Sequence, residues 1–196
     1  MQIPFTRASA GLVARATVAA GLLVTLVGSP ASADPFGTWT SDTGPFADGV
    51  GHTYCWGSGF DAALQDNASA AMTNLDAQTE MFDSFQATCN VVTTDIYFFD
   101  ANLPAGVRGS TRCVTWKTYG VVCDSFDIEI DPAEINVGSD DEADTTKTMC
   151  HEVGHSVGLS HLAPQTDCMI SGEIPSTAAQ WRTYNAHHVS HINDRY

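Results

Sequence analysis

Basic residues are scarce in this chain of 196 residues. Eight lysines and arginines face 23 aspartates and glutamates, which gives a formal net charge of −15 at neutral pH. Because this excess of negative charge repels phosphate backbones and anionic lipid headgroups, we expect neither nucleic acids nor membrane surfaces as partners. Charged residues make up only 16% and apolar residues 43% of the chain, a composition that excludes a disordered protein and is typical of a globular domain.

Long hydrophobic runs are lacking except near the N-terminus. Residues 16–28 (ATVAAGLLVTLVG) are apolar but too few to span a bilayer comfortably. Arg7 and Arg15 stand before them, and residues 31–33 (ASA) fit a small-residue cleavage site. The two arginines are not adjacent, so a twin-arginine export signal is not supported. We therefore interpret residues 1–33 as a secretory signal peptide and expect a secreted, extracellular protein.

Cysteine pairs with the CxxC spacing of metal sites are also absent. All six cysteines lie in the predicted mature chain, residues 34–196, and an even number in an exported protein indicates three disulfides. The sequence does not choose among the many pairings that six cysteines allow. Our working expectation is sequential pairing, which gives Cys55–Cys89, Cys113–Cys123 and Cys150–Cys168.

Apolar periodicity indicates an α+β fold for the mature chain, which we expect to be a monomer. Residues 34–51 are rich in Gly, Pro, Asp and Thr, which predicts an extended arm. Helical spacing predicts helices, and β-rich or alternating runs predict strands. The expected helices cover residues 60–82, 145–159 and 177–192, and the expected strands cover residues 95–99, 111–119 and 126–130, with Pro132 closing the last strand.

The segment CHEVGHSVGLSH, residues 150–161, carries a metal-site pattern. His151 and His155 are four residues apart, so on a helix they stand about 40° apart on one face and can share a tetrahedral Zn²⁺. Glu152 flanks this position without needing to ligate the metal. It can take a proton from water at the metal, which is the role of a general base.

A third ligand, His161, would lie about 9 Å further along the axis if the helix continued. The chain must therefore turn, and Gly158 tolerates the left-handed conformation that ends a helix. Three neutral histidines leave one coordination position open, which is typical of a catalytic rather than a structural zinc site. The sequence thus predicts one catalytic zinc ion.

Other groups of metal-binding residue types lack such a pattern. His187 and His191 are spaced i, i+4 but have no accompanying Glu or third ligand, so we interpret them as part of an exposed helix face. His52 and His188 carry no pattern at all. Residues 124–144 contain nine carboxylates, which we interpret as a solvated acidic loop without EF-hand spacing; structural Ca²⁺ is the alternative.

The pattern resembles the metzincin clan of zinc endopeptidases, whose signature is HExxHxxGxxH followed by a methionine turn. Met169 in DCMISG, eight residues after His161, fits that methionine, whose side chain forms a hydrophobic floor under the metal. The order of elements is similar to that of the matrixin branch, with residues 111–117 (TRCVTWK) in the place of the edge strand that aligns substrate. The resemblance covers about residues 60–192, and only residues 151–169 are specific.

The resemblance implies a metzincin-like catalytic domain. In such a domain a twisted mixed sheet packs with a long helix and an active-site helix, followed by a small C-terminal subdomain with a terminal helix. It also implies cleavage within polypeptide substrates. Two features depart from the clan: Ser171 stands where the astacin and serralysin branches carry a tyrosine, and the arm before the fold lacks the cysteine that keeps matrixins latent.

Two alternatives stay open at the level of the sequence. A zinc hydrolase acting on a non-peptide amide would keep the same site. An exported binding protein with a structural zinc site would need a fourth protein ligand. Cys150 is the nearby candidate for that ligand, but on a helix it points about 100° away from His151.

Overall fold

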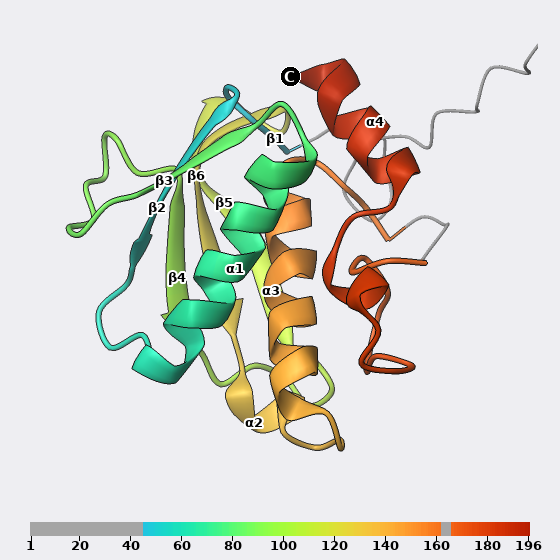
Figure 1. Cartoon of the computed structure of the whole chain (residues 1–196). Helices are drawn as coiled ribbons and strands as arrows, with labels where there is room; N and C mark the ends of the chain where they lie inside the picture. The colour runs from blue at the N-terminus through green and yellow to red at the C-terminus, as the bar shows by residue number, and fades with distance from the viewer. Residues whose placement is uncertain (1–44, 162–165) are drawn as a thin grey trace, which may run out of the picture. The chain divides into compact units, whose positions relative to one another are not determined.

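The computed structural model describes residues 45–161 and 166–196, which form a sheet with helices packed against it (Figure 1). The predicted signal peptide, residues 1–33, and the first part of the predicted arm lie outside the described residues. No helix within these described ranges is long and apolar enough to cross a membrane. In chain order the elements are β1 Phe46–Ala47, β2 Gly51–Trp56, α1 Ala62–Gln78, β3 Phe82–Phe85, β4 Ile96–Asp100, β5 Gly109–Thr118, β6 Val122–Ile130, α2 Pro132–Ile135, α3 Asp141–Ser156, a 3₁₀ turn Ala179–Arg182 and α4 Ala186–Arg195.

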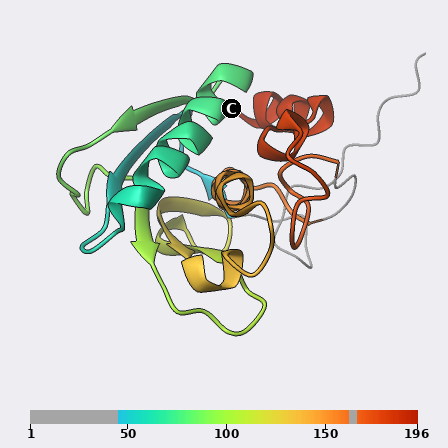
Figure 2. The same cartoon turned by 60° about the horizontal axis from the view of Figure 1, so that its bottom comes forward.

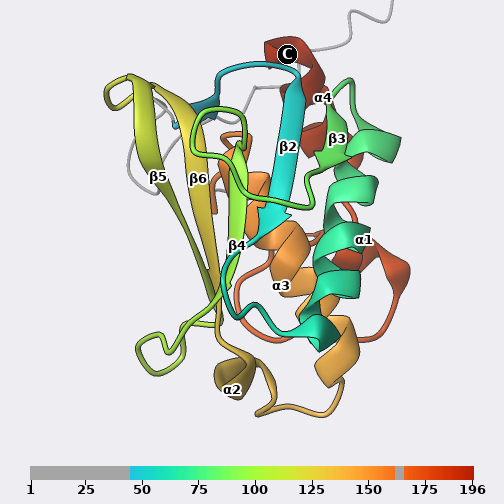
Figure 3. The same ribbon diagram turned by 90° about the vertical axis from the view of Figure 1, so that its left-hand side faces the viewer.

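The sheet is mixed, as expected from the sequence, but most of its pairings are parallel. Its strands follow the order β1-β6-β4-β2-β3, with each neighbouring pair parallel, and β5 joins β6 in antiparallel orientation. This is more parallel pairing than the expected α+β class implies. Figure 3 shows β5, β6, β4, β2 and β3 side by side, with α1 and α3 on one face. Among the described strands β5 pairs only with β6, so its second edge is free.

The core lies between this sheet and the two long helices. The run FDIEI in β6 alternates, with Phe126, Ile128 and Ile130 buried, while Asp127 and Glu129 face Arg112 on β5. From the helical side, α1 contributes Leu64, Ala68, Met72 and Leu75, and α3 contributes Met149 and Val153. Figure 2 looks along α3 and shows it between the sheet and the C-terminal segment. Since α3 is covered on both sides, most of its polar residues are buried as well.

All three predicted helices have different bounds in the structure. Helix α3, predicted over residues 145–159, spans Asp141–Ser156. Helix α1 ends at Gln78, before the predicted end at residue 82, because Thr79 takes extended backbone and Phe82 begins β3. The predicted helix 177–192 is divided into the 3₁₀ turn and α4. The division falls at Asn185, whose side chain accepts hydrogen bonds from the backbone N–H groups of His187 and His188, both at 2.9 Å. This is the N-cap geometry that starts a new helix.

The first three strands were not predicted. Strand β1 and the first residue of β2 lie within the expected arm, residues 34–51. In β2 the inward positions include His52 and Tyr54, so no run of aliphatic residues marks the strand. The predicted strand 126–130 is part of β6, whereas the rest of the acidic stretch 124–144, interpreted as a solvated loop, forms further residues of β6, then α2 and the start of α3.

Three disulfides join the described parts of the chain, in the sequential pairing. Cys55–Cys89 links β2 to the loop after β3, and Cys113–Cys123 links β5 to β6. Cys150–Cys168 links α3 to the segment that follows it. The Cα–Cα distances of these pairs are 5.4, 5.7 and 5.9 Å, which are ordinary for disulfides.

Candidate metal centre

Helix α3 ends in a turn built around Gly158. This glycine has a φ of 96°, a left-handed conformation that is costly for any residue with a Cβ. Its N–H donates to His155 O at 3.1 Å, and the N–H of Leu159 donates to Gly154 O at 3.0 Å. These bonds close the end of the helix as in a Schellman motif. The chain then reverses, and the next residues carry His161 back toward the helix.

The turn brings three histidine side chains to one point. His161 Nε2 lies 2.7 Å from His151 Nε2 and 2.9 Å from His155 Nε2. Their opposite nitrogens are held by the backbone: His151 Nδ1 donates to Cys168 O at 3.0 Å and His155 Nδ1 donates to Leu159 O at 2.8 Å. Because Nδ1 carries the proton in both rings, Nε2 presents a lone pair, which is the donor that binds a cation.

Desolvation keeps these histidines neutral. It lowers the pKa of His151 well below its ordinary value, with the neighbouring histidines adding to the effect, and lowers the pKa of His155 to about 4. The pKa of His161 is lowered for the same reason. Neutral imidazoles are the form that binds metals, and three lone pairs directed at one point call for a cation between them.

Glu152 lies beside this triad against the free-edge strand β5. Its carboxylate accepts a hydrogen bond from Thr111 Oγ1, with 2.7 Å between Oγ1 and Oε2. A Cβ on Gly109 would lie 2.7 Å from Glu152 Oε1, so the carboxylate occupies the space left by that glycine. Burial raises the pKa of Glu152 to about 7, with the Thr111 hydrogen bond acting in the opposite direction. A carboxyl group with such a pKa can accept and release a proton near neutral pH.

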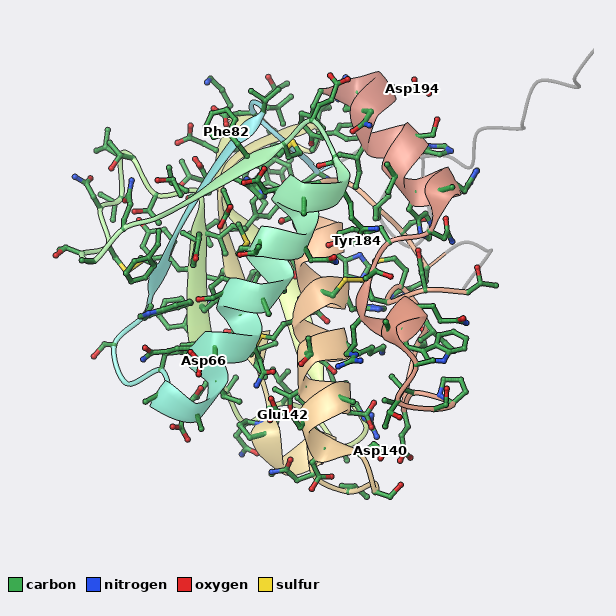
Figure 4. All side chains as sticks on the ribbon, viewed as in Figure 1. Asp66, Phe82, Asp140, Glu142, Tyr184 and Asp194 are labelled. Carbon is green, nitrogen blue, oxygen red and sulfur yellow. A yellow bond between two sulfur atoms is a disulfide. The ribbon has the colours of Figure 1, made fainter. Side chains whose placement is uncertain are left out.

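The segment after α3 supports the site from the other side. Met169 is fully buried, and its N–H donates to Asp167 Oδ1 at 2.9 Å. Asp167 Oδ2 also contacts His188 Nδ1 of α4 at 2.5 Å. Figure 4 shows Tyr184 in the segment alongside α3, where its hydroxyl donates to Cys150 O at 2.8 Å. Residues 167–169, which we call the methionine segment, and the nearby Tyr184 are therefore held against α4 and α3.

Three of the remaining histidines, His52, His188 and His191, lie inside the fold, and His187 is half-buried. His188 and His191 are 4% and 7% exposed, so the prediction of an exposed face at His191 was wrong. That prediction used spacing alone, which does not show which side of a helix packs against the rest of the chain. His52 is completely buried, and its Nε2 lies 2.8 Å from Ser156 Oγ at the end of α3. Within the described ranges, only the triad of His151, His155 and His161 forms a cluster of at least three metal-binding groups.

The triad and Glu152 line a cavity of about 230 Å³ between α3 and the start of β5, which we call the α3–β5 cavity. Two cationic residues line it as well. Arg108 Nη1 pairs with Asp144 Oδ1 at 3.2 Å, and Lys147 Nζ donates to Gly172 O at 2.9 Å. Burial lowers the pKa of Lys147 to about 8, with the charge of Arg108 contributing.

The structure thus brings together His151, His155, His161 and Glu152, with Gly158 in the turn and Met169 beneath α3. Sequence reasoning missed several residues that complete the site, namely Arg108, Gly109, Thr111, Lys147 and Asp167. Each of them acts through a contact between segments that are distant in the chain. No spacing rule connects such positions, and the sequence carries no signal that marks them.

No family model matches the chain, and no curated protein matches it. Among solved structures, it is similar to high choriolytic enzyme 1 (HCE-1), a hatching enzyme zinc-protease from Oryzias latipes, the medaka fish. The TM-score is 0.35 and the sequence identity 16%, over 69% of this chain. The match spans 60% of the length of that structure's chain. The function proposed below therefore rests on the site itself.

Proposed function

We propose that this chain is a secreted zinc-dependent endopeptidase. One observation carries the proposal: three neutral imidazole nitrogens and the carboxylate of Glu152 meet in the α3–β5 cavity, beside the free edge of β5. This combination provides a metal site, a base and a surface for an extended chain. These are the parts that hydrolysis of a peptide bond within a chain requires.

His151, His155 and His161 would hold the zinc ion. Neutral nitrogen donors suit Zn²⁺, and three protein ligands are the number found in catalytic zinc sites. The hydrogen bonds from Nδ1 to backbone carbonyls fix the orientation of His151 and His155. When bound, Zn²⁺ supplies a Lewis acid that polarises the scissile carbonyl and makes a water molecule acidic.

Glu152 is the proposed general base. Its Oε2 is held by Thr111, which leaves Oε1 to accept the proton of the attacking water. The same oxygen then delivers this proton to the leaving amine, so that one carboxyl group acts first as the base and then as the acid. A pKa of about 7 suits both steps, because the group gains and loses a proton at little cost near neutral pH.

Strand β5 is the proposed substrate guide. Gly109, Ser110 and Thr111 line the cavity, and the outer edge of their strand has no partner among the described strands. An extended peptide can add to such an edge through backbone hydrogen bonds. This mode needs no free chain end, which favours endopeptidase over exopeptidase activity.

The alternatives fit less well. Cys150 forms a disulfide with Cys168, so it has no thiolate to offer as the fourth ligand of a structural zinc site. A hydrolase of non-peptide amides would use the same zinc site, but it would have no use for an open strand edge beside the base. Three disulfides support the proposal of an extracellular location.

The test is incubation of the purified protein with a mixed peptide library, followed by mass spectrometry of the cleaved bonds. We expect cleavage within peptides that is lost with a zinc chelator and restored by Zn²⁺. Glu152→Gln should retain zinc and lose at least about 10²-fold in rate, the usual contribution of a positioned base. Glu142→Gln, at the exposed start of the same helix, is the matched control. Near-normal turnover by zinc-loaded Glu152→Gln protein would refute the mechanism.

A further inference from the structure

The α3–β5 cavity contains an unusual share of the positive charge of this protein. After residue 33 the chain has six lysines and arginines against 23 acidic residues. Two of the six, Arg108 and Lys147, line this cavity. Because the chain has so few basic residues, the presence of two of them beside the metal triad needs an explanation of its own.

The charge of Arg108 is balanced within the protein. Its Nη1 lies 3.2 Å from Oδ1 of Asp144, whose side chain is fully buried. The same oxygen accepts a hydrogen bond from the N–H of Ile174 at 2.9 Å. Arg108 and Asp144 therefore form an internal pair that adds no net charge to the cavity.

The charge of Lys147 is not balanced in this way. The residue is 3% exposed, and its Nζ donates to the carbonyl of Gly172, a neutral partner, at 2.9 Å. Among the described ion pairs none involves Lys147. Asp144 and Glu152 act on this ammonium group electrostatically, but neither forms an ion pair with it, and a buried ammonium group without a carboxylate in contact is costly. A carboxylate that enters the cavity from outside would satisfy it.

The rest of the lining combines apolar surface with a few polar groups. Glycines and hydroxyl-bearing residues form much of the wall, and only Pro45, Val107 and Leu159 contribute aliphatic side chains. Thr148, which also lines the cavity, is 3% exposed, and its Oγ1 has no hydrogen-bond partner within the described structure. This hydroxyl can donate to an incoming acceptor.

Lys147 is also placed at a suitable distance from the reaction. It precedes His151 by four residues on α3, so the two side chains lie on one face, one turn or about 6 Å apart along the axis. A side chain on the residue next to the scissile bond can span this distance while the bond lies at the triad.

We infer that the α3–β5 cavity is a subsite for an acidic side chain of the substrate, with Lys147 as the residue that determines specificity. The substrate class is then polypeptides with Glu or Asp next to the cleaved bond. This inference rests on the proposed endopeptidase function. Lys147 acts on the choice of substrate and takes no part in bond cleavage.

The test uses a series of quenched fluorescent peptides that differ only at the residue next to the cleaved bond, with Glu, Gln or Leu there. The wild-type protein should cleave the Glu peptide with a kcat/KM at least about tenfold higher than the Gln peptide, because Glu carries a negative charge that pairs with the Lys147 ammonium group and Gln does not. Lys147→Met should abolish this ratio and cleave the Leu peptide at least as well as before. Lys147→Arg should keep a preference for Glu.

The control is Arg195→Met, which removes a cation at the exposed C-terminal end of α4, outside the cavity; it should leave all three rates unchanged. Binding of the uncleaved peptides to zinc-loaded Glu152→Gln protein, followed by calorimetry, gives a second readout that needs no turnover. We expect tighter binding of the Glu peptide, and loss of this preference when Lys147→Met is added.

The outcomes separate the two proposals. If peptides are cleaved but wild-type protein treats Glu and Gln alike, the endopeptidase function holds and the acidic subsite is refuted. A Glu preference that survives in folded Lys147→Met protein would also refute it. If Lys147→Met does not fold, loss of the Glu preference in Lys147→Arg decides against the subsite. If no peptide is cleaved, the proposed function fails, and calorimetry alone decides whether the cavity binds a carboxylate.

Discussion

Gly154 of α3 and Met169 pack against each other without room for a further carbon atom. A Cβ built on Gly154 would lie 2.5 Å from Met169 Sδ, 3.2 Å from Tyr184 Cε1 and 3.3 Å from Leu159 Cδ1. Gly154 lies between Glu152 and His155 in the metal-site pattern. The absence of a side chain at this glycine therefore lets Met169 pack closely against α3.

Gly154→Ala should destabilise the protein even though alanine is the better helix former. Alanine gains about 1 kcal/mol of helix propensity, whereas overpacking a filled core typically costs 1–3 kcal/mol, so we expect a net loss of about 1 kcal/mol in the free energy of unfolding. Urea denaturation measures this loss. Gly49→Ala is the control, because a Cβ there meets nothing within 4 Å. A Gly154→Ala protein as stable as the wild type would contradict the packing argument.

Gly158→Val should weaken zinc binding although it removes no ligand. A β-branched residue resists the φ of 96°, at a cost of about 1–2 kcal/mol, and relief of this strain would misplace His161. We expect zinc affinity to fall about tenfold, as measured by competition with a chromophoric chelator. Gly120→Val, at φ 74° in the turn between β5 and β6, should lose similar stability but bind zinc normally. Equal zinc affinity in both variants would count against the role of the turn.

Local patterns explain how much could be predicted from the sequence. The histidine spacing, the glycine turn and the alternation in β6 are each encoded within a few residues, so their positions followed directly. Strand β2 was missed because its buried positions include His52, which periodicity treats as polar. The split at Asn185 was missed because a helical stripe of apolar residues continues across it. In β2 one polar residue hides the alternating pattern of a strand, and at Asn185 one polar residue divides a helix that the pattern predicts to continue.

Only the parts of the site that lie within one short segment of the chain were predictable from the sequence. Contacts between Thr111 and Glu152, or between Lys147 and Gly172, join segments that come together only when the sheet and α3 pack. The sequence gives the types of these residues, but it does not show that they lie close together in the folded protein. The metal ligands are the exception, because helix and turn geometry alone place them.

Removal of the Cys150–Cys168 disulfide by a double Cys→Ser change should cost both stability and zinc affinity. The loop has a sequence separation of 18 residues, and its closure is worth about 3 kcal/mol in the chain-entropy model. Cys113–Cys123, with a separation of 10, is the control, since its loss should cost a similar amount but leave zinc binding unchanged. Denaturation and zinc titration of both variants check this. Loss of zinc binding only in the Cys113–Cys123 variant would contradict the role of the Cys150–Cys168 disulfide in holding the zinc site.

The stability of the protein should decrease as the pH is lowered from about 6.5 to about 4, partly because of His52. Burial lowers the pKa of His52 from its ordinary 6.5 to about 4. In this range the unfolded chain binds a proton at His52 and the folded protein does not, so the free energy of unfolding falls as the pH falls. The contribution is about 2 kcal/mol by pH 5.

His52→Gln provides the comparison for this pH effect, because glutamine does not titrate. Urea unfolding of both proteins at pH 7 and pH 5 isolates the contribution of His52, since all other groups are shared. We expect the wild type to lose about 2 kcal/mol more than His52→Gln between these two pH values. Parallel losses in the two proteins would show that His52 is protonated in the folded state at pH 5.

The free edge of β5 also bears on the solubility of the protein. An unpaired strand edge can pair with the edge of a second molecule and start aggregation. Here the pairing of β5 with β6 has register shifts between Cys113 and Thr118. Such irregularities bend a strand and make its edge less suitable for pairing with the strand of another molecule. Only the short regular part from Gly109 to Cys113 can accept another strand, and it lies beside the α3–β5 cavity. The strongly negative net charge of the chain opposes such pairing between copies.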